Sequence, residues 1–165
     1  MRYTPRRPKA QISSKKASRA GPKVQGRILA IDMGSKRVGL AVSDELRLTV
    51  RTLQALPRTP WKRLLSSLNE LCEQLDVRSI VLGLPLRLDG TEGDAAEEVR
   101  RVGRNLELSL RLPLFFQDER LTSIDAESSL RERGFRAGEI PDRVDSEAAS
   151  IILRDFLDAQ RGAEG

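Results

Sequence analysis

The most informative absences in this chain are histidine, paired cysteine and long apolar runs. None of the 165 residues is histidine, which excludes Ser-His-Asp catalysis, Cys-His catalysis and zinc sites built on imidazole. The single Cys72 cannot form an intramolecular disulfide, so nothing indicates an oxidising compartment. No apolar run approaches the ~20 residues that span a bilayer, and the N-terminus lacks the apolar stretch of a secretory signal. These absences predict a soluble intracellular protein whose chemistry rests on carboxylates, lysine, the thiol or bound metal.

The net charge of +5 is concentrated at the N-terminus. Residues 1–26 contain eight Lys or Arg and no acidic residue, whereas the rest of the chain has a net charge of −3. This composition predicts a disordered basic arm over residues 1–26, a single folded domain over residues 27–160 and a flexible tail over residues 161–165. The arm is interpreted as a solubilising extension, a tether for phosphate backbones or an organellar transit peptide.

Apolar periodicity predicts alternating strands and helices after the arm. Strands are expected at residues 28–31, 38–42, 46–53, 80–82 and 114–116, with residues 83–85 ending the fourth. A first helix is expected at residues 61–75, and a second begins at Thr91 with Ala95 and Val99 on its buried face. A short third helix begins at Thr122. A loop over residues 133–144 then leads to the last helix, which runs from Asp145 to the end of the domain. The order β-β-β-α-β-α-β-α-α predicts an α/β fold with a mixed five-stranded sheet and helices on its faces.

Three acidic residues occupy positions where chemistry is expected. Asp32 ends the first strand, Glu119 follows the fifth, and Asp145 opens the last helix. Ligands gather at the carboxyl ends of strands in open α/β sheets, and carboxylates brought together there favour a divalent cation. Oxygen ligands without histidine suit Mg²⁺ or Mn²⁺, and two such ions can cleave a phosphodiester.

Each of these acids also has a structural interpretation. Asp32 can fix a turn, Glu119 can be a solvated loop charge beside Asp118, and Asp145 can cap the helix. Asp44 and Asp89 lie at turns and are interpreted as structural.

Basic side chains near the acids are candidates for phosphate contact. Lys36 and Arg37 follow the Asp32 turn and are expected to contact phosphate, unless they form only a solvated hairpin tip. Arg120 either contacts phosphate or pairs with Asp118, and whether Asp118 shares metal ligation stays open.

Four motifs give the chain a specific resemblance. They are residues 29–44 (LAIDMGSKRVGLAVSD), residues 81–85 with 89–93 (VLGLP and DGTEG), residues 118–123 (DERLTS) and residues 144–149 (VDSEAA). In this order they resemble the YqgF-type family over about residues 27 to 158. That family is known as Holliday junction resolvases and as pre-16S rRNA nucleases.

The resemblance implies a ribonuclease H-like fold, a cytoplasmic location and maturation of the 5′ end of small-subunit ribosomal RNA. Its acidic positions correspond to Asp32, Glu119 and Asp145. The partners that it implies are precursor ribosomal RNA or branched DNA, with pre-ribosomal particles, and the chain acts as a monomer or homodimer. Met33 replaces the proline common in the family, and the usually lysine-rich loop before Asp145 here mixes arginines with acids.

Two other functional classes compete with a nuclease. An actin-like phosphotransferase also opens with a strand-Asp-x-Gly turn, but it needs two such lobes and this chain has one such turn. An RNA-binding assembly factor without catalysis could keep the fold. The chain has only four Phe, one Trp and one Tyr, which argues against an aromatic stacking platform for single strands.

Overall fold

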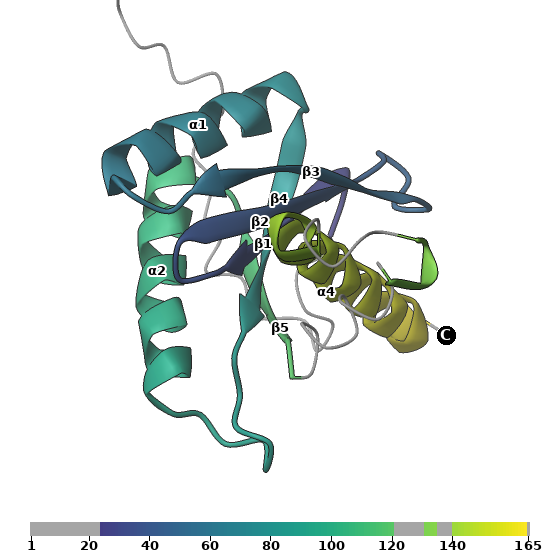
Figure 1. Ribbon diagram of the computed structural model, residues 1–165. Helices are drawn as coiled ribbons and strands as arrows, with labels where there is room; N and C mark the ends of the chain where they lie inside the picture. The colour runs from purple at the N-terminus through teal and green to yellow at the C-terminus, as the bar shows by residue number, and fades with distance from the viewer. Residues whose placement is uncertain (1–23, 121–130, 135–139, 165) are drawn as a thin grey trace, which may run out of the picture.

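The computed structural model describes residues 24–120, 131–134 and 140–164, without the side chains of residues 140–145 (Figure 1). Its strands are β1 (Arg27–Met33), β2 (Arg37–Ser43), β3 (Val50–Pro57), β4 (Val77–Leu84) and β5 (Leu114–Asp118). Its helices are α1 (Trp61–Gln74), α2 (Asp94–Leu110) and α4 (Ile140–Glu164). The predicted succession of strands and helices is confirmed over these residues, whereas the helix predicted from Thr122 falls almost wholly outside them.

The five strands form one mixed sheet in the order β3-β2-β1-β4-β5. β1, β2 and β3 are joined as an antiparallel meander, and β1, β4 and β5 run parallel to one another. Parallel strands need crossover connections, which α1 and α2 supply. The carboxyl ends of β1, β4 and β5 therefore meet at the same edge of the sheet.

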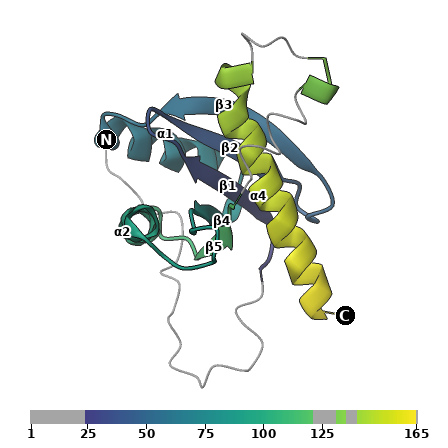
Figure 2. The ribbon, with the colours of Figure 1, turned by 60° about the horizontal axis from the view of Figure 1, so that its bottom comes forward.

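Helices cover the two faces of the sheet unequally, as Figure 2 shows. Of the helices that the structure describes, α1 and α2 pack on one face and α4 crosses the other. Side chains of β1 alternate between the two cores: Leu29 and Ile31 face α1 and α2, while Ile28 and Ala30 face α4. All four are fully buried, as expected for a central strand covered on both sides. The same alternation places Asp32 on the α4 face.

The third strand begins later than predicted because a turn takes up its first residues. β3 spans Val50–Pro57, and the alternating Leu46 and Leu48 lie in the turn before it with 70% and 69% of their surface exposed. The Asp44 carboxylate accepts hydrogen bonds from the backbone N–H groups of Leu48 and Thr49 at 2.6 and 2.8 Å. Those bonds close the turn, and they confirm the structural role predicted for Asp44.

Two helix starts also differ from the prediction. α2 begins at Asp94, because the N–H and hydroxyl of Thr91 instead hydrogen-bond to Asp89, and Ala96 faces the core in place of Ala95. The last helix begins at Ile140, five residues before Asp145, because Pro141 is tolerated in a first turn that needs no N–H donor. It continues to Glu164, so the domain boundary predicted at residue 160 falls inside α4.

Candidate active site

Asp32 and Glu119, which are 87 positions apart in the sequence, form a hydrogen-bonded carboxyl pair. Asp32 lies at the carboxyl end of β1, and Glu119 directly follows β5. The strand between them is β4, and the Glu119 N–H donates to the carbonyl of Leu84 on β4 at 3.1 Å. The pair therefore spans three parallel strands at the edge where their carboxyl ends meet.

Gly83 on β4 makes this pairing sterically possible. A Cβ atom at position 83 would collide with Oε2 of Glu119 and would lie 2.6 Å from Cδ1 of Ile152 on α4. Glycine inside a strand often marks a close approach by another group. The absent side chain thus leaves the space through which the Glu119 carboxyl crosses β4 to reach Asp32. Sequence reasoning treated residues 83–85 as a strand break, but β4 continues through Leu84 by pairing with Asp118.

The environment of the pair retains a proton on Glu119. Burial raises the pKa of Glu119 to about 9, with further contributions from the charge and hydrogen bond of Asp32 and from the charge of Asp118. At neutral pH without metal, the Glu119 carboxyl is protonated and donates to Asp32. A bound divalent cation would replace this proton and neutralise both carboxylates.

This proton predicts a pH-dependent stability for the metal-free protein. The unfolded carboxyl titrates near 4.5 and the folded one near 9, so its stabilising contribution is complete below the lower value and is lost as pH rises toward the upper one. In chelator, the melting temperature of the wild type should fall from about pH 5 to about pH 9 more steeply than that of Glu119→Gln, which cannot ionise. Glu107→Gln, at an exposed position on α2, is the matched control and should follow the wild type. Parallel curves for wild type and Glu119→Gln would contradict the shared proton.

The third predicted acid, Asp145, belongs to α4. Asp145 lies in the second turn of this helix, so its interpretation as an N-cap is wrong, and its side chain is outside the described part of the structure. The neighbouring Ser146 hydroxyl donates to the Leu53 carbonyl at 2.7 Å and accepts from the Leu40 N–H at 3.4 Å. It bridges β2 and β3 where their register shifts, between Val38 and Leu40. Ser146 thereby fixes the start of α4 against the sheet, and a site role for Asp145 stays a prediction.

The described residues contain no cluster of three or more acidic, cysteine or histidine side chains able to hold a metal. Asp118 is engaged elsewhere, because its two carboxylate oxygens accept from the backbone N–H and Nε of Arg120 at 2.9 and 2.7 Å. A metal ion would therefore be held by Asp32 and Glu119 together with a further ligand whose side chain is not among those that the structure describes.

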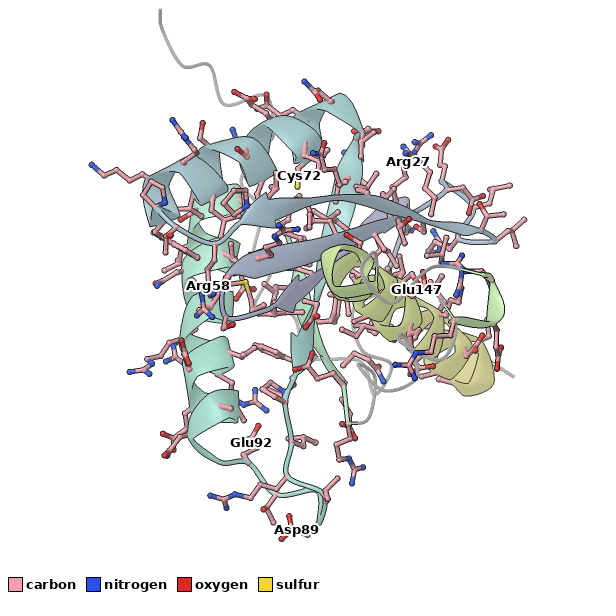
Figure 3. All side chains as sticks on the ribbon, viewed as in Figure 1. Arg27, Arg58, Cys72, Asp89, Glu92 and Glu147 are labelled. Atoms are coloured by element: carbon pink, nitrogen blue, oxygen red, sulfur yellow. The ribbon has the colours of Figure 1, made fainter. Side chains whose placement is uncertain are left out.

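The basic residues beside the pair differ in how they are held. Lys36 and Arg37 are exposed at the tip of the β1–β2 hairpin, next to the Asp32 turn. Arg58 braces this hairpin, because its backbone N–H donates to the Lys36 carbonyl at 2.9 Å and its Nη1 donates to the Gly34 carbonyl at 3.0 Å. Figure 3 shows Arg58 between the hairpin and α2, where Glu98 pairs with it at 2.7 Å. Sequence reasoning missed Arg58, since no local motif indicates a contact over 24 residues.

Asp89 confirms the second structural assignment made from turn chemistry. Its carboxylate accepts from the N–H and the hydroxyl of Thr91 at 2.9 and 2.7 Å, and these bonds hold its pKa below the ordinary value. It lies at the tip of the β4–α2 loop, away from the body of the sheet (Figure 3).

Solved structures with the same fold define the class of protein. RuvC of T. thermophilus in complex with a Holliday junction substrate aligns over 83% of this chain and 96% of its own, with a TM-score of 0.53 and 16% identity. A fowlpox virus resolvase with junction DNA aligns over 81% of this chain and 98% of its own, with a TM-score of 0.53 and 10% identity. The predicted ribonuclease H-like fold is confirmed.

The chain belongs to the RuvX family, described as Holliday junction resolvase, whose sequence pattern matches residues 26–159. A relative from Anaeromyxobacter sp. (strain K), named "Putative pre-16S rRNA nuclease", is 43% identical over 132 residues, which cover 80% of this chain and 96% of the relative. A relative of the same name from Syntrophus aciditrophicus (strain SB) is 44% identical over 133 residues, covering 81% of this chain and 89% of the relative. The resemblance to a nuclease family inferred from four motifs is confirmed.

Proposed function

We propose that this protein is a metal-dependent endonuclease that hydrolyses phosphodiester bonds during maturation of the 5′ end of pre-16S rRNA. The observation that carries the proposal is the Asp32–Glu119 pair, which lies at the carboxyl ends of parallel strands in a member of a nuclease family. The relatives' names support ribosomal RNA as the substrate. A cytoplasmic location and association with pre-ribosomal particles follow from this role.

The donor atoms of the pair fit a hard divalent cation. Two partly buried carboxyl groups that share a proton would each gain from a cation in its place, and only oxygen ligands are on offer. Asp32, Glu119 and Asp145 would hold Mg²⁺ or Mn²⁺, with two ions expected. Bound there, such ions would activate a water molecule and stabilise the leaving oxygen.

The chain's own residues perform the remaining steps. Glu119 gives up its proton as the site is loaded, and Gly83 keeps its carboxyl within reach of Asp32. Lys36 and Arg37, on the braced hairpin tip, contact the phosphates that flank the scissile bond. Asp145, which α4 carries, would supply the third acid, and the Ser146 bond that holds α4 against the sheet supports this role.

Resolution of Holliday junctions is the second candidate activity, because the family carries that description. A resolvase that makes paired cuts needs a two-fold symmetric dimer. The two candidates therefore differ in oligomeric state as well as in substrate.

The deciding experiment compares both substrates with the same purified full-length protein. A precursor RNA that extends beyond the 5′ end of 16S rRNA and a four-way DNA junction are each incubated with Mg²⁺, Mn²⁺, Zn²⁺ or excess chelator. We expect cleavage of the RNA with Mg²⁺ or Mn²⁺, none with chelator, and no rescue by Zn²⁺. Undiminished cleavage in chelator would refute the carboxylate–metal mechanism. Symmetric cuts in the junction alone, by a dimer, would favour the second candidate.

Among the residues that the structure describes, no helix combines the length and the apolar character needed to cross a membrane.

A further inference from the structure

An open cavity of about 400 Å³ lies beside the acidic pair and is not part of it. Its lining consists of Leu88, Gln117, Asp118, Arg120 and Asp155. Asp118 and Arg120 are the two sequence neighbours of Glu119, and Gln117 lies two residues before it on the same side of the strand. Asp155 comes from α4, one turn after Ile152, which packs over Gly83. A group in this cavity would therefore lie next to a phosphodiester bound at the acidic pair.

Leu88 presents an apolar surface at the rim of the cavity. It is 78% exposed and lies in the β4–α2 loop that extends past the end of the sheet (Figures 1 and 3). Hydrogen bonds hold this loop: the Arg87 N–H donates to the Thr91 carbonyl at 2.9 Å, and the Gly90 N–H donates to the Arg87 carbonyl at 2.8 Å. A scattered exposed leucine needs no explanation, but one held by a closed turn over a cavity provides a contact for a flat, weakly polar group.

Arg120 joins the loop to the strand end and has a fixed orientation. Its Nε donates to Asp118 at 2.7 Å, and its Nη1 donates to the Leu88 carbonyl at 3.3 Å. The ion pair with Asp118 neutralises much of its charge, which makes Arg120 a weak anchor for a second phosphate. A planar guanidinium held in place can still stack on the face of an aromatic base.

The polar atoms of the lining favour hydrogen-bond donors on the bound group. The carboxylates of Asp118 and Asp155 are acceptors, each able to accept more than one bond, and the Gln117 amide adds a further carbonyl. The lining holds two carboxylates and one guanidinium, and the resulting negative charge disfavours a phosphate. The exocyclic amino group of adenine, cytosine or guanine would complement them, and uracil lacks such a group.

We propose that this cavity binds the nucleobase adjacent to the scissile phosphate, with Leu88 and Arg120 against its face and a preference for bases that carry an exocyclic amino group. The proposal rests on the nuclease function given above, since only a bound phosphodiester brings a base to this place. Cavities that bind small ligands span roughly 300–1,000 Å³, so the volume suits a single nucleotide unit. Leu88 and Arg120 here take the place of aromatic residues, which the lining of this cavity does not contain.

The test measures binding, so that it does not depend on cleavage. Full-length protein carrying Asp32→Asn, which blocks the chemistry, is titrated with fluorescent oligo(A), oligo(C) and oligo(U) RNA in Mg²⁺ by fluorescence anisotropy. Oligo(A) and oligo(C) should bind more tightly than oligo(U), and Leu88→Ala should weaken their binding by roughly tenfold, the scale of one base-stacking contact. Leu48→Ala, at a leucine 69% exposed in the β2–β3 turn near the other end of the sheet, is the matched control and should change nothing.

Equal affinity for the three oligonucleotides, or equal losses in Leu88→Ala and Leu48→Ala, would overturn the proposal. Failure of the proposed function has a different signature, because the protein with Asp32 intact would then cleave neither RNA nor junction whatever the outcome of the titrations.

Discussion

Replacing Asp32 by Asn, or Glu119 by Gln, should lower the rate of phosphodiester cleavage by roughly 10³-fold or more. Each change removes an anionic oxygen from a site that must hold cationic metal, and such metal supplies several kcal/mol of transition-state stabilisation. Each ~1.4 kcal/mol corresponds to tenfold in rate. The fold should survive, because the amide in each variant keeps the shape of the carboxyl that it replaces and can still hydrogen-bond to the remaining carboxyl. Single-turnover cleavage with Mg²⁺, alongside thermal melting, measures both effects.

Exposed acids elsewhere provide matched controls for these variants. Asp158→Asn on the outer face of α4 and Glu107→Gln on α2 remove the same charge and should retain full activity. Asp145→Asn belongs in the same series. If Asp145 completes the site, this variant should lose as much cleavage activity as Asp32→Asn. Full activity in Asp32→Asn or Glu119→Gln would place the catalytic centre elsewhere. If only Asp145→Asn kept full activity, Asp32 and Glu119 would remain the catalytic residues and Asp145 would no longer be a candidate.

The substitution Gly83→Ala should lower cleavage by roughly 10²-fold although it removes no functional group. The new Cβ would collide with Oε2 of Glu119 and with Cδ1 of Ile152, so the carboxyl must move away from Asp32. Displacement of a catalytic group by about 1 Å can cost about 10² in rate. Overpacking of this kind also destabilises by about 1–3 kcal/mol. Single-turnover rates and melting curves, measured on the same preparations, separate the two effects.

A second variant separates displacement of Glu119 from general destabilisation. Adding Ile152→Val removes the Cδ1 atom and so relieves one of the two collisions. The double variant should regain part of its stability while cleavage stays low, because the collision with Glu119 remains. Gly162→Ala on α4, where a Cβ meets no atom within 4 Å, is the control and should leave the rate unchanged. If Gly83→Ala cleaved at the wild-type rate, the Glu119 carboxyl would not need to cross β4 for catalysis.

The sequence predicted the features that depend on local apolar periodicity and on strand ends. The predicted run at residues 28–31 forms the buried part of β1, which continues one residue past Asp32 to Met33, and the acids Asp32 and Glu119 do lie together. On α1, Cys72 is buried in the core and Trp61 packs against it, as the apolar periodicity of residues 61–75 leads one to expect. Alternation misled at Leu46 and Leu48, because the Asp44 side chain closes a turn there.

Contacts between distant segments could not be predicted from spacing. Gly83 matters because Glu119 and Ile152 approach it, and Ser146 matters because β2 and β3 shift register beneath it. Both need the tertiary fold before their roles are visible. A glycine inside an apolar strand was nevertheless a signal, since it suggests close approach by another group.

The packing of α4 on one face of the sheet has a consequence for synthesis on the ribosome. Among the described residues, α4 is the helix that buries the face formed by Ile28, Ala30, Ala41 and Val81, and its contacts reach as far as Leu157. Until that part of the chain has emerged, the sheet exposes this apolar surface and lacks the Ser146 bridge between β2 and β3. A nascent chain therefore holds Asp32 and Glu119 without the helix that carries Asp145.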